Sequence, residues 1–427
     1  MVSISVLLVC LGCLVLIKAP LAICMALATL LTLTFTSSLP TAAVVQKMFT
    51  GMDSFPLLAV PLFMIAGRLM ELGGISKRLI ELAKNIVGGV TGGLAMVAVL
   101  GCMFFAAISG SAPATVVAIG SIIVPAMVRE GYDKRFSVSL MAAAGTIGVI
   151  IPPSIPFVNY GVAMNVSISK LFMAGFAPGV LMGLSLMAVC YVISKKHGYS
   201  SNFKPSLRGF TKALIDAIWA IMMPVIILGG IYGGLFTPTE AAGVSVLYSI
   251  VVGCFIYREM DAKTLFRCFY EAGALSAMVL MLISTATAMG WVLTVGQVPI
   301  KLSAAIASVS DQAWVILLLL NVALLINGCI MDPNATIIIL GPILLPLLMR
   351  YGIDPLHFGV VMVVNVTIGM LTPPFGVNLF VASGLHKGVT FKDVVQGSWP
   401  FLLVLIFDLM LLTYIPNISL FLVNTFM

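Results

Sequence analysis

Long apolar segments set the strongest limit on how this chain can fold. Several are long enough to cross a hydrocarbon core, which takes roughly 20 residues per helix. Backbone N–H and C=O groups in lipid must be satisfied within the structure, so helices are the expected form. Spans are predicted at 3–17, 21–36, 54–71, 136–151, 170–194, 213–234, 239–257, 268–295, 356–372 and 395–415. Since only 9% of the residues are charged, the sequence predicts an all-α, multi-pass protein of a lipid bilayer.

The basic residues give the chain a formal net charge of +7, but they lie in short loops between the apolar segments. Lysine and arginine in such loops mark the cytoplasmic side, so we expect no nucleic-acid partner. Segment 195–212 holds five of them and no acid, and segment 257–267, two spans later, is again basic. Both segments are therefore predicted to be cytoplasmic.

One stretch of the sequence occurs twice, 221 positions apart. GSAPATVVAIGSIIVPAMVREGYD (110–133) aligns without a gap on MDPNATIIILGPILLPLLMRYGID (331–354). The same shift places TIGVIIPP (146–153) on TIGMLTPP (367–374). Chance similarity of apolar residues would not also align an arginine, an aspartate and the proline pairs. The sequence therefore predicts an internal duplication.

Each copy is predicted to hold the same elements in the same order. Segment 75–87 has apolar residues at helical spacing and charges elsewhere, which indicates an amphipathic arm lying along the membrane interface. Segments 91–108 and 112–128 are apolar pieces joined by the short link SGSAP. That link is too tight for a soluble loop, so we predict a re-entrant helical hairpin whose tip is buried or lines a cavity. A helix broken at the proline pair follows.

Charge places the two copies in opposite orientations. The arm and hairpin end of the first copy are rich in lysine and arginine, whereas the matching places of the second copy hold Lys301 and Arg350 alone. Inverted repeats are typical of secondary transporters. The predicted units are scaffold helices at 1–53, a first repeat at 54–194, a cytoplasmic linker with scaffold helices at 195–267, and a second repeat with the C-terminal helix at 268–427.

The broken helices are the predicted place for chemistry. Glycine and proline expose backbone carbonyls and helix N-termini near the midplane, and sodium needs oxygen ligands with no acid in particular. Alternatively, the serines and threonines satisfy local helix backbone and the glycines permit close packing. The first predicted sodium site comprises Ser109, Gly110, Ser111, Gly145, Thr146, Gly148 and Ile151. The second comprises Gly328, Asp332, Asn334, Thr367, Gly369, Met370 and Thr372.

Three further polar features have two interpretations each. Asp332 is the acid of the second hairpin tip, and it could serve function, cap the helix that begins at Pro333, or do both. Arg68 could meet an anionic substrate, although an interfacial anchor is the favoured interpretation. The third feature is a set of residues predicted to bind the substrate, although its Asn and Tyr side chains could equally join neighbouring helices. The set is Ser111, Pro113, Ser154, Asn159, Tyr160 and Asn378.

Five segments together carry a resemblance to a known family. They are 54–79, 110–127, 152–161, 331–346 and GLFTPTEAAGVSVLY at 234–248. The chain resembles, nearly end to end, the large membrane subunit of tripartite ATP-independent periplasmic (TRAP) transporters. The resemblance implies sodium-driven uptake of organic anions across the bacterial inner membrane. It also implies an elevator motion, in which the hairpins and broken helices move as a block against a scaffold.

Two partners and the cargo follow from the resemblance. The partners are a small membrane subunit of four helices, expected here as a separate polypeptide, and a periplasmic substrate-binding protein. Sialic acid or a similar sugar acid is the favoured cargo, with a C4-dicarboxylate as the alternative. No cofactor is expected, and the metal is sodium at the two sites alone.

Other functional classes explain less of the sequence. A channel could use re-entrant loops but has no need of paired ion sites. An intramembrane enzyme would need a nucleophile with a base or a metal set, which three isolated histidines do not supply. A stand-alone sodium/carboxylate symporter that needs no binding protein is the closest alternative.

Overall fold

The computed structural model describes residues 4–17, 19–37, 39–199, 201 and 203–427. The first residue of the predicted span 3–17 lies outside these ranges. Positions 200 and 202 of the predicted linker also lie outside them. Among the described residues, nine helical segments are long and apolar enough to cross a membrane. The multi-pass prediction is consistent with that count.

Helices account for the whole secondary structure of the described residues. Most bounds lie within a few residues of the predicted spans, but the short helices α3 and α20 were not predicted. The helices are α1 (Ile4–Leu16), α2 (Leu21–Thr36), α3 (Ala42–Met52), η1 (Phe55–Leu58), α4 (Ala59–Leu72), α5 (Ile75–Val87), α6 (Gly93–Ser109), α7 (Ala112–Arg129), α8 (Lys134–Ala144), η2 (Gly145–Val149), α9 (Ile155–Met164), α10 (Ile168–His197), α11 (Leu207–Tyr232), α12 (Pro238–Ile250), η3 (Val251–Ile256), α13 (Ala262–Val295), α14 (Val298–Ala307), α15 (Ala313–Ile330), α16 (Pro333–Arg350), α17 (Pro355–Gly369), α18 (Val377–Ser383), α19 (Phe391–Tyr414) and α20 (Asn417–Phe426).

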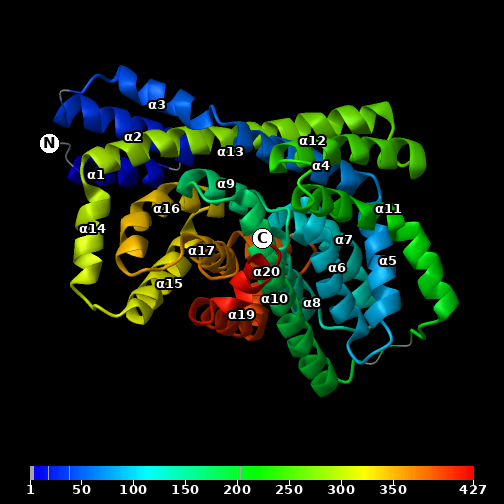
Figure 1. Cartoon of the computed structure of the whole chain (residues 1–427). Helices are drawn as coiled ribbons and strands as arrows, with labels where there is room; N and C mark the ends of the chain where they lie inside the picture. Colours follow the sequence, from blue (N-terminus) through cyan, green and yellow to red (C-terminus); the bar gives the residue numbers. More distant parts are fainter. Residues whose placement is uncertain (1–3, 18, 38, 200, 202) are drawn as a thin grey trace.

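The helices form a frame around a central bundle (Figure 1). Helix α13 runs along one edge of the molecule and contacts α2, α3 and α4, while α1 packs on α2 and α12 on α4. Helix α14 descends from one end of α13, and α5 with α11 closes the opposite side (Figure 1). The paired helices α6/α7 and α15/α16 and the broken helices lie inside this frame.

The predicted arm over 75–87 is helix α5, with the same bounds. Its buried face includes Ile75, Leu79, Ile80 and Ala83, so the spacing of apolar residues decided which side packs. Ile86, near the C-terminal end of the arm, is 46% exposed. The buried face also includes the polar residues Ser76 and Asn85, so it is not confined to apolar side chains.

The two copies of the duplicated segment have the same backbone course. Helix α7 spans 112–129 and its counterpart α16 spans 333–350, a shift of 221 at both ends. Gly131 and Gly352, at the same shift, both have a positive φ. Asp133 and Asp354 both cap the helix that follows, and the two proline pairs have cis bonds. The sequence duplication is thus a structural one.

Each copy packs against the hairpin of the other copy: α18 contacts α7, and α9 contacts α16. A Cβ added at Gly120 in α7 would lie 2.5 Å from Leu385, just after α18, and one added at Gly341 in α16 would lie 3.2 Å from Met164 at the end of α9. These two contacts are related by the shift of 221. Each broken helix therefore packs its second half against the hairpin of the other copy, which ties the two copies into one bundle.

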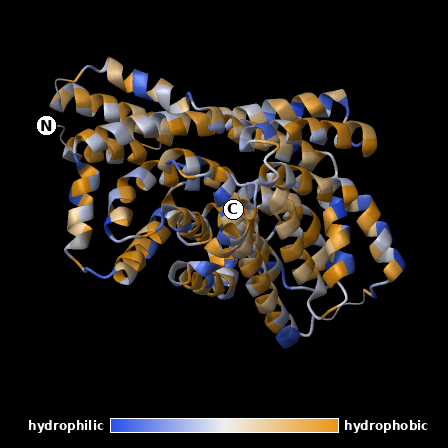
Figure 2. Cartoon of the chain, viewed as in Figure 1, coloured by the Kyte–Doolittle hydropathy of each residue, from blue (hydrophilic) through white to orange (hydrophobic). Residues whose placement is uncertain are grey.

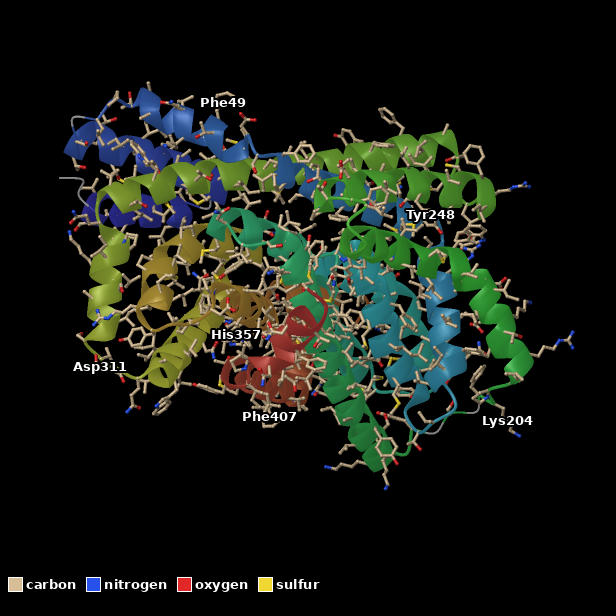
Figure 3. All side chains as sticks on the ribbon, viewed as in Figure 1. Phe49, Lys204, Tyr248, Asp311, His357 and Phe407 are labelled. Atoms are coloured by element: carbon tan, nitrogen blue, oxygen red, sulfur yellow. The ribbon has the colours of Figure 1, made fainter. Side chains whose placement is uncertain are left out.

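Hydrophobic residues dominate most helices, and hydrophilic residues gather at helix ends and loops (Figure 2). Many large hydrophobic side chains are exposed. Phe49 on α3 and Phe407 on α19 are 68% and 61% exposed and point outward (Figure 3). His357, in contrast, lies within the central bundle, where its ring nitrogens contact Ser419 Oγ at 2.8 Å and the Thr413 carbonyl at 3.3 Å. Such an apolar exterior suits lipid and not water.

Candidate functional site

The tips of the two helical hairpins, one from each copy, line a single cavity of 810 Å³. The first tip contributes Ser109–Ala114 and the second contributes Asp332–Asn334. Helices α4 and α13 of the frame form the opposite wall, with Met64, Gly67 and Met278 among the residues that line it. The cavity therefore lies between the bundle and the frame.

The first tip depends on a glycine. Helix α6 ends at Ser109, and Gly110 has φ +60°, a conformation that L side chains rarely adopt. A Cβ at Gly110 would also lie 3.0 Å from the carbonyl oxygen of Pro153. The Ser111 carbonyl accepts hydrogen bonds from Thr115 at 2.8 Å and from Ser109 at 3.4 Å. This tip is thus neutral and folded onto the proline pair.

The second tip carries an acid. Asp332 caps α16 by accepting a hydrogen bond of 2.8 Å from the Asn334 backbone N–H, so the capping interpretation is confirmed. Thr336 in α16 donates to the Asn327 side chain in α15 at 2.6 Å, a bond that joins the two helices on either side of the turn. Asn334 Oδ1 in turn accepts from Asn159 Nδ2 at 2.7 Å. That last bond joins the second tip to the broken helix of the first copy.

The first break packs directly on the first tip. A Cβ at Gly148 would lie 2.9 Å from the Ser111 carbonyl oxygen, and one at Gly145 would lie 3.3 Å from that of Ala112. Thr146 is buried and donates to the Ala143 carbonyl at 2.6 Å, as expected of a threonine that satisfies local backbone. Ile151 is also buried. The structure therefore brings Gly145 and Gly148 against the first tip, while Thr146 and Ile151 are buried in the same break.

The second break approaches the end of α15. A Cβ at Gly369 would lie 2.5 Å from the Gly328 carbonyl carbon, so the two backbones touch. Thr367 and Thr372 donate to carbonyls one helical turn earlier, at 2.5 and 3.0 Å. Asp332, Asn334 and Met370 from the same predicted set line the cavity.

The predicted substrate residues divide into two groups. Ser111 and Pro113 line the cavity. The other four are buried outside its lining and bonded within the protein: Ser154 caps α9, Asn159 bonds Asn334, Tyr160 donates to the Pro355 carbonyl at 2.6 Å, and Asn378 donates to the Ala142 carbonyl at 3.4 Å.

The sequence singled out Arg68 but not the charged groups that surround it. Arg68, from α4, lines the cavity and is paired with Glu71 and Glu271. Both interpretations of Arg68, contact with an anion and anchoring at the interface, stay predictions. A cation within an otherwise apolar span was the available signal for Arg68. Glu271 gave none, because its partner is 203 positions away.

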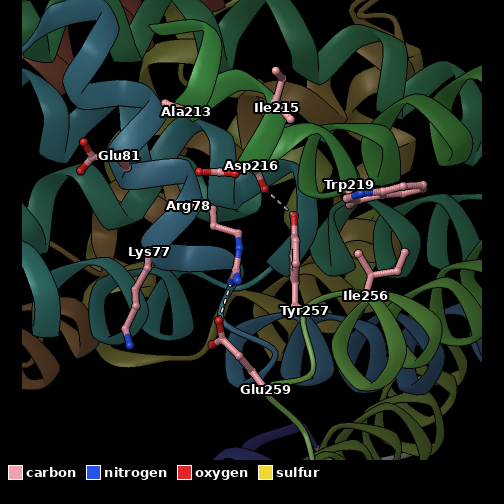
Figure 4. A pocket seen from close by; sticks show the side chains of 10 residues that line it. All are labelled: Lys77, Arg78, Glu81, Ala213, Ile215, Asp216, Trp219, Ile256, Tyr257 and Glu259. Carbon is pink, nitrogen blue, oxygen red and sulfur yellow. Dashed lines mark hydrogen bonds and ion pairs between the residues drawn. The ribbon is translucent and has the colours of Figure 1, made fainter. Parts of the chain in front are cut away.

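A second hollow, of 680 Å³, lies between α5, α11 and η3 (Figure 4). Arg78 stacks over the Tyr257 ring at 3.7 Å and pairs with Glu259 at 2.7 Å, and Tyr257 donates to the Asp216 carbonyl at 2.9 Å. Burial raises the pKa of Tyr257, and Arg78 opposes this. These mutually satisfied groups join the arm to the frame.

In the described part of the chain, no three His, Cys, Asp or Glu side chains lie close enough together to hold a transition-metal ion. The oxygen groups near the two breaks are backbone carbonyls and hydroxyls, with the Asp332 carboxylate and the Asn334 amide oxygen at the second tip. Oxygen groups of this kind are hard ligands, which suit zinc or iron less well.

Residues 8–418 match the family described as "Tripartite ATP-independent periplasmic transporter, DctM component". The chain belongs to this family. The resemblance found in the sequence is therefore confirmed, and the permease is a transporter component of the bacterial inner membrane and not an enzyme.

Named relatives differ in cargo and in length. The permease is 48% identical to the isethionate TRAP transporter permease protein DctMQ of Oleidesulfovibrio alaskensis, covering 95% of this chain and 64% of that one. It is 44% identical to the C4-dicarboxylate large permease protein DctM of Pseudomonas aeruginosa, covering 88% of each. It is 39% identical to the sialic acid permease protein SiaT of Haemophilus influenzae, again covering 64% of that chain.

The fold of the permease has a solved counterpart. The YdaH transporter of Alcanivorax borkumensis superimposes with a TM-score of 0.63 over 87% of this chain and 86% of its own, at 15% sequence identity. At that identity the likeness concerns the fold alone.

Proposed function

We propose that this permease carries out sodium-coupled uptake of an organic anion that a periplasmic binding protein delivers. The observation that carries the proposal is the convergence of both hairpin tips on one cavity. Paired tips of opposite repeats, with unwound backbone beside each, are how secondary transporters build a site for substrate and coupling ions.

The proposed mechanism is an elevator. The two repeats, 54–194 and 268–427, are inverted, and their hairpins and broken helices move as one block against a scaffold built from the remaining helices and the arms. The crossed contacts of Gly120 with Leu385 and of Gly341 with Met164 support a single moving block, because they tie each copy to the other. The cavity between bundle and frame supports a sliding boundary at α4 and α13.

The two sodium sites are proposed at the breaks. Close approach of Gly148 to the Ser111 carbonyl supports the first, and contact of Gly369 with Gly328 supports the second. In each, carbonyl oxygens supply most ligands, and Asp332 adds a charge to the second. The re-entrant character of the hairpins is proposed from their short tips, which line the cavity.

The cargo is proposed as an organic anion, since relatives are named for isethionate, C4-dicarboxylates and sialic acid. Sialic acid, favoured from the sequence, stays a prediction, with a C4-dicarboxylate as the alternative. Ser111 and Pro113 are proposed to contact the anion directly. The buried residues Ser154, Asn159, Tyr160 and Asn378 would reach it only through movement of α9 and α18.

Two partners complete the proposal: a separate small membrane subunit of four helices and a periplasmic binding protein. The matched region covers 64% of the relative named isethionate TRAP transporter permease protein DctMQ, and family membership supports both partners.

Uptake by proteoliposomes tests the proposal. Vesicles with the permease and its small subunit receive the binding protein, an inward sodium gradient, and radiolabelled sialic acid, succinate or isethionate. We expect accumulation of one of these anions only when sodium gradient and binding protein are both present. Accumulation without the binding protein would establish the stand-alone symporter instead. Flux that ignores sodium and exceeds carrier turnover would establish a channel.

A further inference from the structure

A chain of four charged groups connects α4 to α13 at the cavity. Arg68 Nη1 donates to Glu71 Oε2 at 2.7 Å, and Arg68 Nε donates to Glu271 Oε2 at 2.8 Å. The other oxygen of Glu271 accepts from Arg267 Nε at 2.6 Å. The order is therefore Glu71, Arg68, Glu271, Arg267, with no net charge.

Arg68 occupies a distinct place in this chain. Of the described residues that line the cavity, it is the one with a positive charge, whereas Glu71, Glu271 and Asp332 bring negative charge to the same wall. Its neighbour Gly67 contacts the first hairpin tip, since a Cβ there would lie 3.4 Å from the Ser109 Cα. An anion that enters the cavity therefore has one cationic side chain to pair with, and that side chain lines the same cavity as the hairpin tip.

The guanidinium also has a suitable form. Its planar donors match the oxygens of a carboxylate or a sulfonate, which a lysine ammonium does not. Arg68 is already held by two carboxylates, so a substrate carboxylate or sulfonate can take the place of one of them without leaving the arginine unpaired. Losing Arg68 costs Glu271 little, because Glu271 keeps Arg267. Within the described residues, Glu71 has Arg68 as its one ion-pair partner.

We propose that Arg68 receives the anionic group of the substrate, and that Glu71 competes for the same guanidinium and returns to it as the substrate leaves. This inference rests on the proposed function, because it assigns a role within the same cavity. The chain lies where α4 approaches the arm and α13 leaves the basic segment 257–267, which is the predicted cytoplasmic end. Competition there favours release into the cytoplasm.

Anion binding to the purified permease with its small subunit tests this assignment. Thermal stability is measured against succinate, isethionate and sialic acid in saturating sodium, with sodium alone as the reference. For an anion that stabilises the unchanged protein, we expect Arg68→Gln to raise the apparent Kd about 10- to 100-fold, the effect of losing a charged hydrogen-bonded pair. Arg68→Lys keeps the charge without the fork and is expected to fall between. Stabilisation by sodium alone stays unchanged in both variants.

Two further variants separate recognition from structural support. Arg267→Gln removes the exposed end of the same chain, which does not line the cavity, and should leave the Kd unchanged. Glu71→Gln removes the competitor and should lower the Kd several-fold, a result that a merely structural ion pair would not produce. An unaltered Kd in Arg68→Gln, or no anion-dependent stabilisation of the unchanged protein, would overturn the assignment.

Uptake distinguishes this failure from that of the proposed function. If Arg68→Gln accumulates the anion on a sodium gradient with an unchanged KM, the role of Arg68 is rejected and the proposed transport function is kept. If anion binding depends on Arg68 but the protein shows no sodium-driven uptake, the role of Arg68 is kept and the proposed transport function is rejected.

Discussion

The two hairpin tips have the same backbone plan and different chemistry. The first is Ser-Gly-Ser, neutral, with Gly110 in the left-handed region, and every residue of its break from Gly145 to Ile155 is buried. The second tip carries Asp332, and its break is partly exposed, with Phe375 at 65%. Duplication thus preserved the geometry while the polar groups diverged. The difference teaches that the second break is the more exposed one and that its tip is the one that carries a formal charge.

Backbone contact at the two breaks gives the largest expected effect. Gly369→Ala would place a Cβ 2.5 Å from the Gly328 carbonyl carbon, where only main chain could yield, so we expect uptake to be abolished. In Gly148→Ala, the new Cβ would meet the Ser111 carbonyl oxygen at 2.9 Å and the buried Thr115 side chain, a contact with one backbone atom and one side chain, so a smaller loss is expected. Sodium-driven uptake in proteoliposomes measures both.

Gly290→Ala is the matched control, because nothing lies within 4 Å of a Cβ there. It should retain full uptake. Equal activity of Gly369→Ala and Gly290→Ala in well-folded protein would remove the second sodium site.

The charge of the second tip gives the next effect. Asp332→Asn keeps a good helix cap but removes the negative charge from the proposed cation site. We expect the sodium concentration for half-maximal uptake to rise about tenfold or more, since a charge near a monovalent ion is worth about 1 to 4 kcal/mol. Ser111→Ala at the neutral tip should cause a smaller rise.

Asp354→Asn provides the control, because Asp354 caps α17 through Leu356 at 2.7 Å and does not line the cavity. Its sodium dependence should match that of the unchanged protein. A similar rise in Asp332→Asn and Asp354→Asn would mean that capping alone accounts for the effect.

The hydrogen bond between the copies gives the smallest effect. Asn159→Ala leaves Asn334 without its 2.7 Å donor, at a cost of about 1 to 3 kcal/mol in the free energy of unfolding. A double-mutant cycle with Asn334→Ala, followed by thermal unfolding, isolates the coupling. Additive effects of the two changes would show that this bond does not hold the copies together.

Local features could be predicted well from the sequence. The bounds of α5 at Ile75 and Val87 follow from amphipathic spacing, and the break after Ala144 follows from glycine and paired prolines. Helices α3 and α20 were not predicted, since neither is long enough to stand out as a span. The bond of Asn159 to Asn334 was not predictable, because 175 positions separate them.

The sequence by itself determined the membrane class, the family, the duplication and the positions of the two breaks. Each of these depends on hydropathy or on residues that stop a helix, which act over a few positions. Tertiary structure alone decided that both tips share one cavity, that the half-helices cross between copies, and that Arg68 lines this cavity and pairs with Glu271. These contacts arise from the packing of whole helices, and helix packing depends on side chains far apart in the chain.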